Sequence, residues 1–231
     1  MVDINRLLNK FVESGLAGGM AGGLAASTLT NVISGKKGKK SKKVKKVASS
    51  ALKVGGLALV GGLAYKAYQH YKENQLSGSK PNPGALDTGR IAMPPSRETA
   101  FIPATDDTSS QSSMGMLLVQ AMIAAAKADG QIDAGENQRI YSQLRQLDLS
   151  AEEKAFLLEE FGKPLNIDAL VKAVDSPEIA AEVYAASLLA VDTLTPAEKA
   201  YLDMLAARLN LDQALVQELH TSVSTVHTIK G

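Results

Sequence analysis

The residues whose types could do chemistry in this chain are carboxylates at two predicted helix–helix corners. The first corner, residues 125–136, reads AAKADGQIDAGE, and the second, residues 190–198, reads AVDTLTPAE. Carboxylate oxygens are preferred ligands of divalent cations such as Ca²⁺. If the two corners lie close together, their acids form one anionic site that binds a cation weakly. The candidate ligands are Asp129, Asp133, Glu136, Asp192 and Glu198.

The first corner resembles the second half of a calcium-binding EF-hand loop. With Asp129 at the fifth loop position, Glu136 falls at the twelfth, where a bidentate glutamate belongs. Positions one and three are then Ala125 and Lys127, so two oxygen ligands are missing, which argues against an EF-hand. The same residues also have a structural explanation, in which Asp133 and Glu136 form the capping box of the next helix.

Other catalytic and metal-binding arrangements are absent from the sequence. There is no Cys, which excludes thiol catalysis, thiolate metal sites and disulfides. His70, His220 and His227 are not spaced as metal ligands on one helix face. No nucleophile elbow, phosphate-binding loop or zinc-protease motif is present. We therefore predict that the protein is not an enzyme and has no cofactor beyond a possible divalent cation. A hydrolase that uses the acidic corner is the catalytic alternative.

The acidic corners belong to a predicted all-helical domain over residues 113–231. Apolar residues recur at helical spacing from Met114 onward, and no alternating pattern indicates strands. Capping signals at Ser150, Ser176 and Thr195 mark helix starts, and the last two precede a proline at the first helical position. We predict an all-α fold with a bundle of about seven helices near residues 114–128, 134–147, 151–161, 167–174, 177–192, 196–209 and 212–227.

The two halves of the chain carry opposite charge. Residues 1–110 contain 16 Lys and Arg against 7 Asp and Glu, whereas residues 111–231 contain 9 against 17. A basic end of this kind favours contact with anionic lipid or nucleic acid. Most of the positive charge comes from a Lys-rich segment, residues 36–46. Its predicted contacts with lipid headgroups are Lys36, Lys37, Lys39, Lys40, Lys42, Lys43, Lys45 and Lys46.

Two apolar stretches flank the Lys-rich segment. Residues 15–33 contain no charge, and residues 47–65 contain only Lys53. As a helix the second stretch would be about 28 Å long, close to the hydrocarbon thickness of a bilayer. The stretch ends at Tyr65, and Tyr68 and Tyr71 follow. Tyrosines at such a position are typical of the aromatic belt at a membrane–water interface. We predict that residues 47–65 span a membrane, with a buried hairpin or an interfacial helix as the alternative.

Small residues recur four apart in both apolar stretches, and such stripes let helices approach closely in lipid. We therefore expect the Gly-rich helices to self-associate, as between copies in a homo-oligomer. A flexible Gly/Ala-rich linker is the alternative for residues 15–33. A short amphipathic helix over residues 3–14 precedes them. The predicted packing glycines are Gly15, Gly19, Gly23, Gly55 and Gly62.

A predicted linker separates the two halves. Residues 77–112 hold five of the eight prolines and are rich in Ser, Thr and Gly, a composition typical of extended, mobile chain. A structureless loop of this length is uncommon inside a compact domain. We predict three parts, namely a membrane-associated region (1–76), a linker (77–112) and the helical domain (113–231).

The acidic string of the first corner, followed by the second corner near residues 192–201, resembles the TerB-like domain associated with tellurite resistance. The order of the segments resembles the bacterial YebE-like inner-membrane family. These resemblances imply an all-helical fold, an envelope or stress association and no established enzymatic activity. They also imply a metal site on Asp129, Asp133 and Glu136. The second corner has Thr195 where the first has Asp133, so it supplies one carboxylate fewer.

These observations predict a membrane-anchored, non-enzymatic helical interaction or stress-response module, with lipid and an unidentified protein as partners. The positive-inside rule puts the Lys-rich segment in the cytoplasm and the C-terminal domain in the periplasm. The TerB-like resemblance instead favours the cytoplasm for that domain. The alternative function is a soluble nucleic-acid-binding protein that uses residues 36–46. The acidic C-terminal domain and the lack of aromatic residues near the lysines argue against it.

Overall fold

All regular structure in the described part of the chain is helical. The computed structural model describes residues 3–14, 56–77, 101, 108–128, 149–191 and 194–230. No strand occurs in these ranges, so the predicted all-α fold is confirmed. The predicted helix over residues 134–147 lies outside them. The helices are α1 (Ile4–Ser14), α4 (Gly56–Ser77), α5 (Thr108–Ala126), α7 (Ala151–Gly162), α8 (Ile167–Lys172), α9 (Pro177–Leu189), α10 (Pro196–Arg208) and α11 (Gln213–Lys230).

Side-chain caps begin three of these helices at the predicted positions. At α7, Ser150 Oγ accepts the Glu153 N–H at 3.2 Å, and the Glu153 carboxylate accepts the Ser150 N–H at 2.7 Å. The same reciprocal box joins Thr195 and Glu198 at α10. Ser176 caps α9, with proline at the first helical position. Each cap satisfies N–H groups that a helix start otherwise leaves without a partner.

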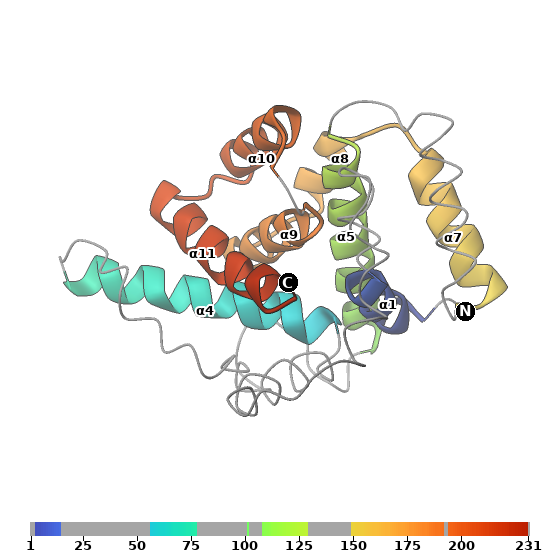
Figure 1. Cartoon of the computed structure of the whole chain (residues 1–231), viewed down its shortest axis with the longest axis horizontal. Helices are drawn as coiled ribbons and strands as arrows, with labels where there is room; N and C mark the ends of the chain where they lie inside the picture. Colours follow the sequence, from blue (N-terminus) through green and yellow to red (C-terminus); the bar gives the residue numbers. More distant parts are fainter. Residues whose placement is uncertain are drawn as a thin grey trace, which may run out of the picture.

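Helix α9 is the centre of the fold, with α4, α5, α10 and α11 packed around it (Figure 1). All ten residues from 180 to 189 are buried, and four of them are alanines, whose small side chains let neighbouring helices approach closely. A helix that is apolar on every side is stable in water only when other elements cover it. We call α4, α5, α9 and α11 the helical core.

The described half of the apolar stretch 47–65 belongs to helix α4, which packs against other helices. Residues 56–65 form its first half, and Leu57, Val60 and Leu63 are buried against other helices of the core. The helix does not end at Tyr65 but continues to Ser77, and Tyr65 contacts the ring of Phe101 at a centroid distance of 5.6 Å. Among the described residues, no helix is both long enough and apolar enough to cross a bilayer. Residues 47–55 lie outside the described part.

Helix α1 confirms the predicted amphipathic helix and docks on α4 and α5. Its buried face consists of Ile4, Leu7 and Leu8. Gly56 permits the contact, because a Cβ atom there would lie 2.9 Å from the backbone carbonyl of Leu8. The Gly56 N–H also donates to the side-chain oxygen of Asn9. The first residue of α4 therefore lies directly against α1.

Helix α5 begins inside the predicted linker. Its first residue is Thr108, six residues before the predicted start at Met114. The intervening run is rich in Ser and Thr, which composition alone assigns to a linker. Hydroxyl side chains are favourable at helix N-termini, so a run of Ser and Thr is also compatible with the start of a helix. Here the run belongs to α5 and not to a linker.

Candidate functional site

The predicted cation ligands are almost all outside the described residues. These are Asp129, Asp133, Glu136 and Asp192. Glu198 is described, and only 1% of it is exposed. Its carboxylate accepts the Thr195 N–H at 2.8 Å, so it serves as a helix cap. In the described ranges, no group of three or more His, Asp or Glu could hold a metal ion.

Most of the other predicted site residues also lie outside the described part of the chain. The eight lysines of the Lys-rich segment lie outside the described part, as do four of the packing glycines, Gly15, Gly19, Gly23 and Gly55. Gly62 is described and is buried within α4. The close helix approach that glycine permits is observed instead at Gly56, one residue beyond the predicted Gly55.

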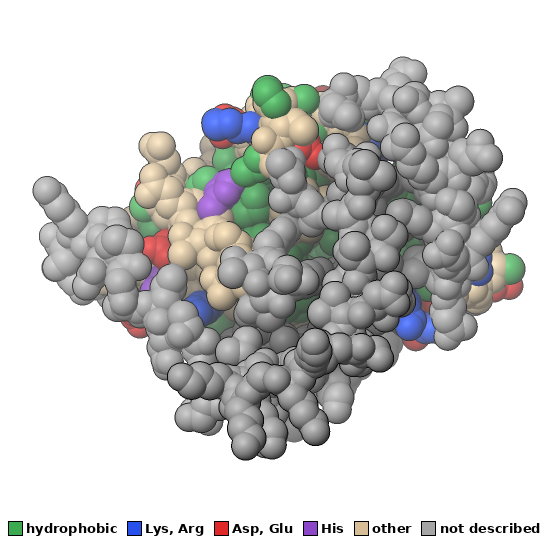
Figure 2. Space-filling view, in the orientation of Figure 1, with side chains coloured by type: hydrophobic (Ala, Val, Ile, Leu, Met, Phe, Trp, Pro, Cys, Tyr) green, Lys and Arg blue, Asp and Glu red, His purple; other side chains and the backbone are tan. Residues whose placement is uncertain are grey.

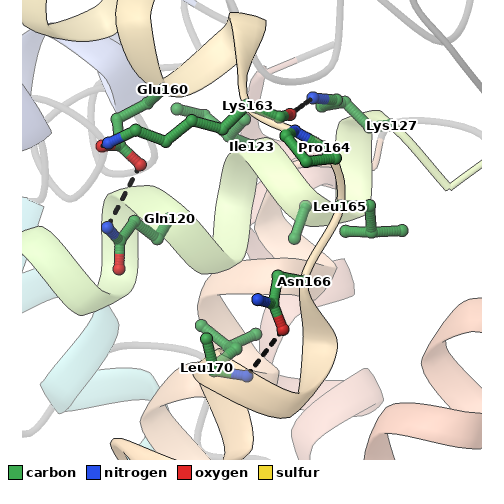
Figure 3. A pocket seen from close by; sticks show the side chains of 11 residues that line it. Gln120, Ile123, Lys127, Glu160, Lys163, Pro164, Leu165, Asn166 and Leu170 are labelled. Carbon is green, nitrogen blue, oxygen red and sulfur yellow. Dashed lines mark hydrogen bonds and ion pairs between the residues drawn. The ribbon is translucent and has the colours of Figure 1, made fainter.

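A pocket of about 310 Å³ lies between α5, α7 and the connection from α7 to α8 (Figure 3). Gln120, Ile123 and Ala124 of α5 and Lys127, the residue directly after it, follow one another at helical spacing along one wall of the pocket. The opposite wall consists of Glu160, Lys163, Pro164, Leu165, Asn166, Ala169 and Leu170. Among the described residues that line the pocket, none carries a hydroxyl or an imidazole group.

Polar bridges at both ends of this face hold α7 against α5. At one end, Gln120 Nε2 donates to Glu160 Oε2 at 3.1 Å. At the other, Lys127 Nζ donates to the carbonyl oxygens of Phe161, at 2.9 Å, and Lys163. Between the bridges, α5 presents only the side chain of Ile123 and the methyl group of Ala124. The pocket lies over these two apolar residues.

Lys127 stabilises the C-terminal end of α7. Its side chain is 8% exposed, and burial lowers its pKa while the Glu160 carboxylate opposes that shift. A cation is favourable at a helix C-terminus, where carbonyl groups lack partners within the helix. In the sequence this lysine served only as evidence against calcium binding. The available signal was a single charge on an otherwise apolar face of a predicted helix.

Glu160 and Lys163 form the polar edge of the pocket. Glu160 is 8% exposed, and its Oε1 pairs with the Lys163 ammonium group. Lys163 also pairs with Glu159 at 3.2 Å, and half of its side chain remains exposed. The hydrogen bonds that Lys163 donates to these two carboxylates, first Glu160 and then Glu159, raise its pKa. The lining residues thus carry two lysines and one glutamate.

Comparison with known families identifies the chain. The family model described as "Protein of unknown function (DUF533)" matches residues 16–223, most of the sequence. The chain belongs to the DUF533 family. No curated protein and no solved structure matches it. The DUF533 match takes in the Lys-rich segment, the helices from α4 to α10 and all eleven residues that line the pocket.

The core of this DUF533 protein also contains a buried carboxyl group, on Glu182 of α9. Glu182 is fully buried, and neither carboxylate oxygen has a hydrogen-bond partner among the described residues. Desolvation raises the pKa of this group well above its ordinary value. An unpartnered charge in the core is costly, so the neutral acid is the stable form there.

A histidine–tyrosine pair lies elsewhere in the DUF533 core. His220 Nε2 is 3.0 Å from the hydroxyl of the buried Tyr184, joining α11 to α9. Burial lowers the pKa of His220, with Asp203 opposing and Lys199 reinforcing the shift. The pair does not line the pocket, and it joins two core helices, as a structural contact does.

Large hydrophobic side chains are exposed at two places in the described part. Leu194 and Met204 lie at α10, where Figure 2 shows hydrophobic side chains on the upper edge of the face in view. Leu165 lies at the edge of the pocket and is 39% exposed. Of these three residues, Leu165 borders the concave site described above. The pocket is therefore the better candidate for ligand binding.

Proposed function

We propose that this DUF533 protein is a membrane-associated, non-enzymatic helical binding module. Its Lys-rich segment, residues 36–46, holds the folded core against anionic lipid headgroups. Residues 15–55 contain nine Lys and no acid, whereas the rest of the chain contains 16 Lys and Arg against 24 Asp and Glu. Each lysine near an anionic membrane surface contributes about 1 kcal/mol. The rest of the chain has a net negative charge and would not be attracted to that surface.

The contact between α1 and α4 carries this proposal. Gly56 packs on Leu8 and bonds to Asn9, so α1 and the start of α4, the described elements on either side of residues 15–55, are in contact. A return crossing of the membrane would have only residues 47–55 before α4 begins. Nine helical residues extend about 14 Å, well short of a hydrocarbon layer of about 30 Å. We therefore propose association with one membrane face instead of a spanning segment.

The contact between α1 and α4 also bears on which side of the membrane the helical core occupies. If residues 15–55 return to the core without crossing, the core lies on the side that holds the lysines. By the positive-inside rule that side is the cytoplasm, in place of the periplasm expected from the sequence. The resemblance to YebE-like proteins supports the bacterial inner membrane, and the TerB-like resemblance supports a stress-related role. A protein partner would bind the exposed helical core.

Weak cation binding at the first acidic corner is a subsidiary part of the proposal, supported by the TerB-like resemblance. It concerns Asp129, Asp133 and Glu136, with Asp192 as a further ligand. Glu198 is left out because its carboxylate is buried in a helix cap. Calorimetric titration of the full chain with Ca²⁺ and Mg²⁺ tests this site, and the absence of a saturable heat would remove it.

Vesicle binding tests the main proposal. The full chain is sedimented with vesicles of phosphatidylcholine alone or mixed with phosphatidylglycerol, at low and high salt. We expect binding only to the anionic vesicles and release by salt. Substitution of the eight lysines of residues 36–46 by Gln weakens binding at least about 100-fold, because each lysine contributes separately.

A matched variant separates this effect from a general loss of charge. Lys154, Lys172 and Lys199 lie on α7, α8 and α10, outside the Lys-rich segment, and their substitution by Gln should leave vesicle binding nearly unchanged. Thermal unfolding followed by circular dichroism checks that each variant is folded. Equal binding to neutral vesicles would contradict the proposal. Salt-sensitive binding of duplex DNA without vesicle binding would support the nucleic-acid alternative instead.

A further inference from the structure

The ring of Phe101 is buried against one side of α4. Only 3% of Phe101 is exposed. Its ring centroid lies 5.6 Å from that of Tyr65 and 5.3 Å from that of Tyr68, with interplanar angles of 80° and 63°. Edge-to-face contacts of this kind are favourable between aromatic rings, beyond the burial of their surface. Two tyrosines therefore hold one phenylalanine ring in a defined orientation.

Tyr65, Tyr68 and Lys72 form what we call the aromatic face of α4. Their spacings of three and four residues put them on one side of the helix, and Lys72 Nζ lies 4.5 Å from the centre of the Tyr68 ring. Both tyrosines pack against the core but remain partly exposed, even with Phe101 in contact with them. The aromatic face therefore lies at the surface of the helical core, where a segment from outside the core can reach it.

Phe101 itself does not come from a helix of the core. It lies in the chain between α4 and α5, within the Pro-rich and Ser-rich stretch of residues 77–112. A single ring buries little apolar surface compared with a core helix such as α9, and ordering the chain beside it costs conformational entropy. The free-energy difference between the docked and the undocked ring is therefore small enough for a competing ring to overcome.

We propose that the aromatic face of α4 binds a phenylalanine from a non-helical segment of a protein partner, and that Phe101 occupies this site until such a segment displaces it. Phe101 is tethered to the core through α4 and α5, so its effective concentration at the site is high and a partner must compete with it. The site supplies the partner-binding part of the proposed function. Its test contains no lipid, so a failure of peptide binding and a failure of vesicle binding are separate results.

A synthetic peptide of residues 96–107, SRETAFIPATDD, tests the site. The full chain is titrated into the isotope-labelled peptide, whose NMR signals report binding. We expect Phe101→Ala, which vacates the site, to bind one peptide per chain. The wild type binds at least about tenfold more weakly, because its own Phe101 competes. No binding to Phe101→Ala that circular dichroism shows to be folded, or equal binding to both proteins, would overturn the proposal.

A milder variant keeps the test decisive if Phe101→Ala does not fold. Phe101→Leu retains an apolar side chain at the site but loses the edge-to-face contacts with Tyr65 and Tyr68. Its own side chain competes less well than phenylalanine does, so it should bind the peptide at least about threefold more tightly than the wild type. Equal affinities of Phe101→Leu and the wild type would contradict competition at this site.

Changes in the peptide and in α4 localise the contact. The peptide with Phe101→Ala shows no saturable binding, because it lacks the ring that the site holds. In the chain that carries Phe101→Ala, the further changes Tyr65→Leu and Tyr68→Leu together weaken peptide binding at least about fivefold, since two edge-to-face contacts are lost. Tyr71→Leu is the matched control at the next tyrosine of α4, whose ring contacts Tyr68, and should leave affinity nearly unchanged. Undiminished binding in the folded Tyr65 and Tyr68 variant would show that the peptide is held elsewhere.

Discussion

At the scale of single residues, buried polar groups distinguish this core from a purely apolar one. Lys127 has its hydrogen bonds satisfied by the end of α7, whereas Glu182 has no partner for its carboxylate among the described residues. The sequence shows both residues but not their partners, because Phe161 and Lys163 lie more than 30 positions from Lys127. The carboxylates singled out for metal binding have a simpler role where they are described, since Glu198 caps α10.

Glu182 makes the stability of the protein depend on pH. Its pKa in the folded chain is raised by burial, above the ordinary value of 4.5. The contribution of Glu182 to the free energy of unfolding is therefore most favourable below pH 4.5. It is lost as the pH rises from there towards the pKa that Glu182 has in the folded chain. Glu182→Gln removes the titration, so its free energy of unfolding should exceed that of the wild type increasingly as the pH rises. Within this window the difference grows by about 1.4 kcal/mol per pH unit.

Urea unfolding of both proteins at several pH values measures this difference. Glu178→Gln is the matched control, because Glu178 lies one turn earlier on α9 and is only partly buried. Its free energy of unfolding should follow the wild-type pH profile. Parallel profiles for wild type and Glu182→Gln would mean that the buried carboxyl group does not titrate differently in the folded state.

At the scale of helices, local sequence signals predict where a helix begins, but they do not predict which parts of the protein surround it. Ser150, Ser176 and Thr195 fix three starts through contacts only three residues away, which a sequence displays directly. The apolar stretch 47–65 was ambiguous, because a bilayer and a protein core favour the same residue types. Its described half is buried through contacts with α9 and α11, more than 100 positions distant in the sequence. The pocket escaped prediction for the same reason.

The bridge from Lys127 to α7 predicts a loss of stability when the lysine is removed. Lys127→Met leaves the carbonyl oxygens of Phe161 and Lys163 without their charged donor. We expect the free energy of unfolding in urea to fall by about 1–3 kcal/mol. Lys172→Met, on the exposed face of α8, removes the same charge without such a bridge and should change stability little. Equal stabilities for both variants would show that the bridge contributes nothing.

The contact between α1 and α4 can be tested by adding one methyl group. Gly56→Ala places a Cβ atom 2.9 Å from the Leu8 backbone, so α1 must shift, at a cost of about 1–3 kcal/mol. Gly162→Ala at the end of α7 meets no atom within 4 Å and should be neutral or slightly stabilising. Thermal unfolding measures both. A Gly56→Ala protein as stable as Gly162→Ala would contradict the close packing.

At the scale of the whole molecule, the helical core brings together parts of the chain that the sequence separated. The predicted division at residues 77–112 put α4 with a membrane region and α9 and α11 with a distant domain. In the described residues these helices pack against one another. Composition and charge suggest this division because they differ between the segments. They carry no information on which segments pack against one another. The contacts of α4 with α9 and α11 show that segments on both sides of residues 77–112 share a core.

The central claim is that α4 stays in the helical core while the protein is bound to a membrane. The chain has no Cys, so Asn74→Cys and Glu218→Cys place one thiol on α4 and one on α11, at positions whose wild-type side chains meet with Asn74 Nδ2 and Glu218 Oε1 3.3 Å apart. Cys side chains are shorter than Asn and Glu, so the two thiols are joined by a short bis-maleimide and not as a disulfide. The measurement is the yield of this cross-link in the variant free in solution and bound to phosphatidylglycerol vesicles. We predict equal cross-linking in both states. Cross-linking in solution that is lost on the vesicles would show that α4 leaves the core, and would contradict the claim.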